Sequence, residues 1–307
     1  VDVNENDFLL SIESVKNAIT PRTKAIMAVD VAGYPCDFDA LYDLVQQPEI
    51  LKLFTPKNEF ESELGRIAIL SDAAHSLGAT YKGRKTGALA DITVFSFHAV
   101  KNLTTAEGGA ICLNLPTQFD EEEIYRNFYI KILHGQTKDA LTKSQLGSWR
   151  YDVIEPGFKC NMTDIQAAMG RIELKRYESE NIPRRKVIFE RYAQALKQKS
   201  WAVIPDFVSN ERETSYHVFL LRIKHCSEEQ RDVIMDKIFA ENVSVNVHFQ
   251  PLPLLSVYKN MGYEMSDYPQ AYDNYSCEIS LPVYFNLSDE DVNRVINTVI
   301  LAVESTL

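Results

Sequence analysis

The stretch DITVFSFHAVKNLTTAEGG, residues 91–109, joins an apolar, strand-type run to Lys101 and ends on two glycines. A similar apolar run, RIAILSD at residues 66–72, comes shortly before it and ends on Asp72. Continuous apolar runs of this kind are typical of strands buried on both faces of a parallel sheet, and ligands bind at the carboxyl ends of such strands. We therefore expect Asp72 and Lys101, which have opposite charges, at one edge of the same sheet.

The first half of the chain alternates strand-type and helix-type segments. Helical spacing at residues 11–20 and 38–45 brackets a short apolar run at 24–31, and GGAICLN at 108–114 supplies a further strand. Residues 47–65 are mixed and charged, which indicates a loop. Strands separated by helical segments predict a mostly parallel sheet that is covered on both faces.

The pattern changes after residue 162. Residues 164–177 and 184–198 have apolar positions every three or four residues, as in long helices. A strand, helix, strand, helix series follows, at 216–223, 228–242, 243–249 and 289–304. We therefore expect an α/β protein with a large domain at 1–162 and, at 163–307, interdomain helices and a smaller α+β domain.

Composition excludes several classes of protein. The 307 residues have a formal net charge of −11, so no basic face for nucleic acid is expected. No apolar run approaches the roughly 18 residues of a membrane span, so no membrane contact is expected. The cysteines are odd in number, widely spaced and without a CxxC pair, which favours reduced thiols in the cytoplasm over disulfides or a metal site. These cysteines are Cys36, Cys112, Cys160, Cys226 and Cys277.

Asp72 and Lys101 each have an ordinary structural explanation when taken singly. Asp72 could be the N-cap of a helix starting in DAAHS, and Lys101 could be a solvated loop lysine. Taken together, SDAAHSLGATYKGRKTG and DITVFSFHAVKNLTTAEGGAI closely resemble the sugar aminotransferases of the DegT/DnrJ/EryC1/StrS family. The resemblance continues through PRTKAIMAVDVAGYPCDFDAL, EPGFKCNMTDIQAAMG, SYHVFLLRI and EISLPVYFNLSDEDVNRVI, which covers essentially the whole chain.

The resemblance implies a pyridoxal 5′-phosphate (PLP) enzyme with the aspartate-aminotransferase fold, known as fold type I. Lys101 would form a Schiff base with the cofactor and afterwards carry the proton, and Asp72 would pair with the pyridine nitrogen. His75 would lie against the cofactor ring, and Ser96 would donate its hydroxyl to the phosphate. Asn161 would reach the phosphate of a neighbouring subunit, which implies a homodimer, while its alternative role is N-cap of the helix at 164.

The same resemblance places His134 and His248 near the substrate. Relatives often have a histidine two residues after a proline in this region, whereas this chain has Pro253 there. The implied reaction moves an amino group, from L-glutamate, to a keto group of a nucleotide-linked sugar for polysaccharide or other amino-sugar synthesis. The run around Lys101 is most similar to enzymes that aminate C4, and C3 stays open.

Two other functions compete with this one. A dehydratase of the same family would replace the lysine by histidine, so Lys101 counts against it. A non-catalytic regulatory or scaffold homologue is disfavoured by the retained Asp72, Ser96 and Lys101. The family fold also begins before the residue that matches Val1, with a turn that binds the cofactor phosphate. The sequence therefore resembles the carboxyl-terminal three quarters of the fold, and we expect this chain alone to be poorly active.

Overall fold

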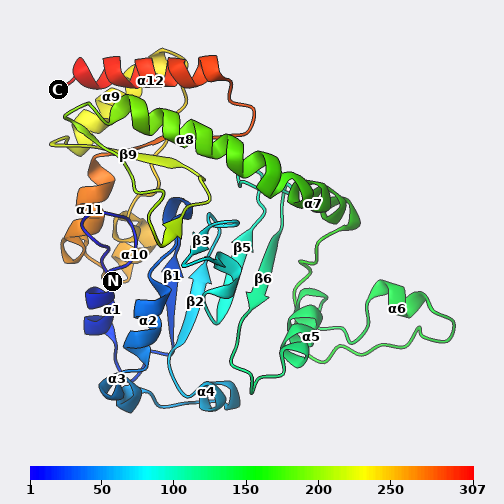
Figure 1. Cartoon of the computed structure of the whole chain (residues 1–307). Coiled ribbons are helices and arrows are strands. Elements are labelled where there is room, and N and C mark those ends of the chain that lie inside the picture. Colours follow the sequence, from blue (N-terminus) through cyan, green and yellow to red (C-terminus); the bar gives the residue numbers. More distant parts are fainter.

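A four-stranded sheet organises the first half of the molecule (Figure 1). The computed structural model describes the backbone of residues 1–307 and every side chain except those of Ala140 and Leu141. Strands β1 and β2 are parallel, as are β2 and β5, and β6 is antiparallel to β5, which confirms a mostly parallel sheet. In spatial order the strands are β1 (Ala25–Val29), β2 (Ala68–Asp72), β5 (Ile92–Ser96) and β6 (Gly109–Leu113).

Helices cover one face of this sheet. Ile26, Ala28 and Ile69 point to that face and share a buried cluster with Phe38 and Leu41 of α2 (Phe38–Val45). The other helices of this region are α1 (Ile12–Ala18), α3 (Pro48–Leu53) and α4 (Glu59–Leu64).

The expected loop at 47–65 is wrong, because it contains α3 and α4. Pro48 occupies the first turn of α3, where a missing N–H costs no hydrogen bond. At the start of α4, the side chain of Asn58 accepts the backbone N–H of Glu61. Single residues at the helix ends thus determine where these two short helices begin, and apolar periodicity contributes little.

Among the described residues much of the opposite face of the sheet is exposed, so the prediction of a sheet covered on both faces is also wrong. Ala68 and Ile92 on this face do pack against a small buried cluster. Met27, Val29, Val94 and Ile111 are 63%, 42%, 48% and 47% exposed. In the strand register Val29 lies beside Asp72, and Asp72 lies beside Val94. The carboxylate of Asp72 therefore belongs to this exposed face, at its carboxyl edge.

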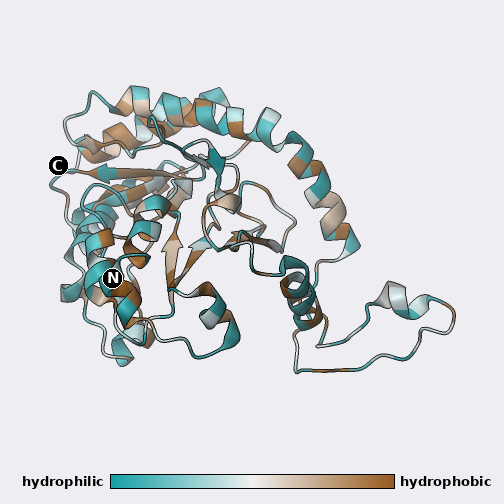
Figure 2. Ribbon diagram, turned by 60° about the horizontal axis from the view of Figure 1, so that its bottom comes forward, coloured by the Kyte–Doolittle hydropathy of each residue, from teal (hydrophilic) through white to brown (hydrophobic). Residues whose placement is uncertain are grey.

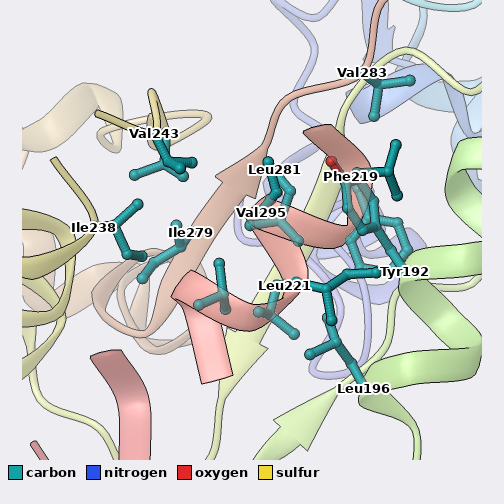
Figure 3. Packing of buried hydrophobic residues seen from close by; sticks show 14 of the residues in the cluster. Tyr192, Leu196, Phe219, Leu221, Ile238, Val243, Ile279, Leu281, Val283 and Val295 are labelled. Carbon is teal, nitrogen blue, oxygen red and sulfur yellow. The ribbon is translucent and has the colours of Figure 1, made fainter. Parts of the chain in front are cut away.

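The second half forms a smaller antiparallel sheet covered by long helices. β10 (Glu278–Leu281) and β7 (Ala202–Val203) flank β9 (Phe219–Ile223). Side chains of this sheet pack against α8 (Ile182–Leu196), α9 (Glu228–Ala240) and α12 (Asp289–Glu304), as Figure 3 shows for part of the cluster. The strand expected at 243–249 is wrong, since this segment makes only the single bridge between Asn246 and Ser280.

The remaining elements connect these two parts. In Figures 1 and 2 the segment between α5 and α7, which includes α6, projects away from the rest of the chain. A three-stranded sheet joins the halves by pairing β8 with β3. The strands of this sheet are β3 (Thr80–Tyr81), β4 (Arg84–Lys85) and β8 (Arg212–Glu213). The helices not yet described are α5 (Glu121–Ile132), α6 (Ala140–Ser144), α7 (Asp164–Arg176), α10 (Ser256–Asn260) and α11 (Pro269–Ser276).

The two larger groups of buried apolar side chains fall within residues 9–90 and 188–303. The domain division at residue 163 stays a prediction. Over the described residues, the helices all fall short of the length and apolar character that a membrane crossing needs.

Candidate functional site

The site begins at the carboxyl edge of the central sheet. Asp72 ends β2, and its Oδ1 accepts the backbone N–H of Ala74 at 3.1 Å. The chain then makes tight turns through Gly78, whose φ of +87° favours glycine. No helix begins in the described residues directly after Asp72, so its alternative explanation as a helix N-cap is wrong. Ser96 ends β5 and accepts the backbone N–H of His98 at 3.3 Å.

Lys101 lies in the turn between β5 and β6. Its backbone N–H donates to His98 O at 2.9 Å, and Thr105 N–H donates to Phe97 O at 2.9 Å. A side chain on Gly109 would meet Phe95 O at 2.7 Å, so the returning strand needs glycine there. The double glycine thus lets the chain turn back tightly after the lysine.

The Lys101 amine is half-buried and close to a carboxylate. Burial lowers its pKa from the usual 10.5, and the charge of Asp72 acts in the opposite direction. A lysine with a lowered pKa has a larger fraction of free amine near neutral pH, and the free amine is the nucleophilic form.

Asn102 anchors this turn to the second half of the chain. Its side-chain N–H donates to Ser215 O at 2.8 Å, and its Oδ1 lies 2.7 Å from His217 Nδ1. Its backbone oxygen accepts from Asn181 Nδ2 at 2.9 Å, and Asn181 is held in turn by buried Arg185 at 2.8 Å. Asn102 is not among the site residues predicted from the sequence, although its position directly after Lys101 is a signal for it.

Three histidines and a phenylalanine form a wall around the site, which we call the histidine wall: His75, His217, His248 and Phe249. The rings of His75 and His217 are 4.2 Å apart, and His75 is stacked on Phe249 at 5.7 Å. The ring of His248 lies edge-on to His75 at 6.4 Å.

The histidine wall is uncharged at neutral pH. Burial, together with the nearby Lys101 and His248, lowers the pKa of His75 to about 3. Burial also lowers the pKa of His217 and of His248. The charge of Lys101 acts on all three imidazoles, and the charge of Arg185 also acts on His217.

Asn161 and His134 lie outside this arrangement. The side chain of Asn161 contacts Lys159 Nζ and donates to Met162 O at 3.3 Å. The expected alternative role of Asn161 as helix N-cap is wrong, because Thr163 caps α7 in a capping box with Gln166. His134 follows α5, and its described contact is the backbone N–H bond to Phe158 O at 2.8 Å.

Comparison with known proteins gives the fold a class. The chain superposes over its full length on Spr1654 from Streptococcus pneumoniae, covering 75% of its PLP form at a TM-score of 0.94 and 41% identity. The PMP form has a TM-score of 0.95 and 43% identity, with 76% of that chain covered. Helicobacter pylori PseC, an aminotransferase involved in the biosynthesis of pseudoaminic acid, matches at a TM-score of 0.81 and 25% identity, over 99% of this chain and 73% of PseC. The fold is that of the fold type I PLP-dependent aminotransferases.

Sequence comparison places the chain within that class. The model of the DegT/DnrJ/EryC1/StrS aminotransferase family matches residues 1–54 and 61–300. The spore coat polysaccharide biosynthesis protein SpsC of Bacillus subtilis is 35% identical, and MJ1066 of Methanocaldococcus jannaschii is 37% identical, each over 97% of this chain. The chain belongs to the DegT/DnrJ/EryC1/StrS aminotransferase family, and it spans 71% and 72% of the length of these two relatives.

The residues at the sheet edge fit PLP. His75 is 8% exposed, and its Nδ1 is a buried polar atom without a hydrogen-bond partner among the described residues. Such an atom is costly to leave unpaired, and a ligand that reaches it would remove that cost. The same end of the sheet supplies an amine for an aldehyde, a carboxylate for a protonated ring nitrogen and a hydroxyl for a phosphate, on Lys101, Asp72 and Ser96.

Proposed function

We propose that this protein is a PLP-dependent aminotransferase that moves an amino group from L-glutamate to the keto group of a nucleotide-linked sugar. The observation that carries the proposal is the half-buried Lys101 amine, which has a lowered pKa beside Asp72 at the carboxyl edge of the sheet. Family membership supports the reaction class, and a relative named for spore coat polysaccharide biosynthesis supports a sugar substrate.

Each residue of the site has a defined task in this proposal. When bound, PLP supplies an electron sink for the charge that develops on a carbon losing its proton. Lys101 holds the cofactor covalently and, once released, moves that proton as a general base and acid. Asp72 holds a proton on the pyridine nitrogen, Ser96 donates to the phosphate, and His75 lies against the ring.

The sugar would bind against the histidine wall. Neutral imidazoles accept or donate hydrogen bonds without adding charge, which suits sugar hydroxyls. His248 is the member that we assign to the substrate, and His134 would approach it from the projecting segment. Asn161 would serve the cofactor of a second copy, so the proposal includes a homodimer, and it includes a cytoplasmic location.

Labelling of Lys101 tests the cofactor part of the proposal. The chain is incubated with PLP, reduced with borohydride and digested, and the modified peptide is found by mass spectrometry. We expect one dominant label on Lys101 and a visible absorbance band before reduction, both lost in Lys101→Ala. The matched control is Lys224→Ala, which removes an exposed lysine and should leave the label unchanged. Labels scattered over surface lysines in the wild type would refute the proposal and favour a non-catalytic homologue.

The substrate part needs a second assay. The loaded protein is treated with L-glutamate, and 2-oxoglutarate is measured, followed by a panel of nucleotide-linked keto-sugars. Amination at C4 or at C3 would identify the position. Loss of a sugar hydroxyl without transfer of nitrogen would instead identify a dehydratase.

A further inference from the structure

Glu278 is a fully buried acid that the proposed reaction does not use. It begins β10 and points to the same side of the strand as Ser280, two residues on. Its Oε1 lies 2.6 Å from Ser280 Oγ, and its Oε2 accepts the backbone N–H of His248 at 3.0 Å. Ser280 Oγ in turn lies 2.7 Å from His248 Nδ1. These three residues close a small hydrogen-bonded ring behind the histidine wall.

The ring has two internally consistent arrangements, because a serine hydroxyl has a single proton to donate. If Glu278 is ionised, Ser280 donates to the carboxylate and accepts from His248 Nδ1–H, which leaves Nε2 without a proton. If Glu278 is protonated, its O–H donates to Ser280, the serine hydroxyl turns to Nδ1, and the proton of the imidazole lies on Nε2. The backbone N–H of His248 donates to Oε2 in both cases, so the carboxyl proton belongs on Oε1.

We propose that Glu278 is a positioning residue that selects, through Ser280, which nitrogen of His248 carries the proton. Nε2 of His248 then accepts a hydrogen bond from a substrate hydroxyl in one state and donates to a substrate oxygen in the other. This inference rests on the proposed function in one respect, since it takes His248 as a contact of the sugar. No hydrogen bond of His248 Nε2 is seen among the described residues, so that atom is available to a ligand.

The surroundings of Glu278 allow both states near neutral pH. Burial raises its pKa to about 8, against the opposing effects of the Ser280 hydroxyl, the His248 N–H and the charge of Arg231. Arg231, on α9, directs its Nη1 to the carbonyl oxygens of Tyr275 and Glu278 at 3.0 and 3.4 Å. Arg222 lies opposite Glu278 on β9.

Arg222 is engaged elsewhere, since its guanidinium donates to Asn274 and to the backbone oxygens of Glu5 and Asn6. His248 faces Lys101 and His75, and burial together with the charge of Lys101 lowers its pKa. The imidazole therefore stays neutral over the range in which Glu278 titrates, and only its tautomer changes.

Nitrogen NMR of the imidazoles tests the proposal without cofactor or substrate. The chain has six histidines, so histidine labelled with ¹⁵N in the ring gives few signals, and His248→Gln assigns the one of interest. In the wild type we expect the Nε2–H tautomer below about pH 8 and the Nδ1–H tautomer above it. In Glu278→Gln the amide N–H replaces the acid O–H as donor to Ser280, so the Nε2–H tautomer should persist from pH 6.5 to 9.5.

Two further variants make the result decisive. Glu264→Gln, which replaces an exposed glutamate, should keep the wild-type tautomer change. Ser280→Ala removes the hydroxyl that connects Glu278 to His248 and leaves Glu278 in place, so it should abolish the tautomer change. This variant still tests the proposal if Glu278→Gln does not fold. A wild-type tautomer that stays constant from pH 6.5 to 9.5, or a change that persists in Ser280→Ala, would overturn the proposal.

The outcomes separate this inference from the proposed function. A tautomer change together with failed labelling of Lys101 would overturn the aminotransferase and leave the role of Glu278 intact. Labelling of Lys101 together with a constant tautomer would support the aminotransferase and overturn the role of Glu278.

Discussion

His75 should make the protein sensitive to acid. In the native state its pKa is about 3, against 6.5 for an ordinary histidine, because the ring is buried and faces Lys101. A depressed pKa means that the unfolded state binds the proton first as the pH falls. The contribution of the neutral ring to stability is therefore complete above about pH 6.5 and is lost progressively between 6.5 and 3.

The size of the effect follows from the shift. Each pH unit in this window costs about 1.4 kcal/mol, so 1.5 units of acidification, from 6.5 to 5, should cost about 2 kcal/mol. In His75→Asn this loss is absent, whatever the substitution does to stability at pH 7. The free energy of unfolding should thus fall by about 2 kcal/mol more in the wild type than in the variant between pH 7 and pH 5.

Urea unfolding at the two pH values measures this difference. Trp201 packs against the core of the smaller sheet, so tryptophan fluorescence reports the loss of that core. His225→Asn, at an exposed position with a φ of 58° that asparagine tolerates, controls for the removal of a histidine outside the histidine wall. Equal losses in wild type and His75→Asn would show that His75 becomes protonated in the folded protein, which would refute the reasoning.

Two further predictions concern stability. Asp91→Ala should cost about 3–5 kcal/mol in urea unfolding, because it leaves the largely buried side chain of Arg66 without the two 2.7 Å bonds to the carboxylate. Tyr42→Phe removes only the 3.1 Å bond to the same carboxylate and should cost about 1 kcal/mol; equal costs would contradict a dominant Arg66–Asp91 pair. Phe219→Ala should cost about 3–5 kcal/mol, since this fully buried ring lies 5.2 Å from Phe189 and 5.4 Å from Tyr192. Phe239→Ala, at a ring that is 44% exposed, should cost clearly less in the same assay.

Much of the local structure could be predicted from neighbouring residues. The helices at 38–45 and 289–304 have the expected bounds, because Asp37 and Ser288 cap their first turns and the apolar spacing continues to their ends. The strand-end rule placed Asp72 and Lys101 together at the sheet edge. These signals are local, so a single sequence is enough to find them.

The segment 243–249 shows where such signals fail. Its alternating apolar residues favour a strand, yet it contributes only the bridge between Asn246 and Ser280. Strand formation needs a partner with free hydrogen-bonding groups along its length, and that is a property of the neighbour. The same limit explains why an apolar run predicted a covered sheet while Met27 and Val94 are exposed.

The sequence by itself determined the class of fold, the family and the two residues of opposite charge at the sheet edge. Only the tertiary structure decided how those residues are held. Asn102 forms hydrogen bonds with Ser215 and His217, which are more than 110 residues away in the sequence. Glu278 forms a hydrogen bond with His248, which is 30 residues away. The orphaned nitrogen of His75 and the lowered pKa of Lys101 arise from burial, which depends on every segment packed around them. Residues that are distant in sequence create the environments of His75 and Lys101, so a local sequence pattern cannot predict them.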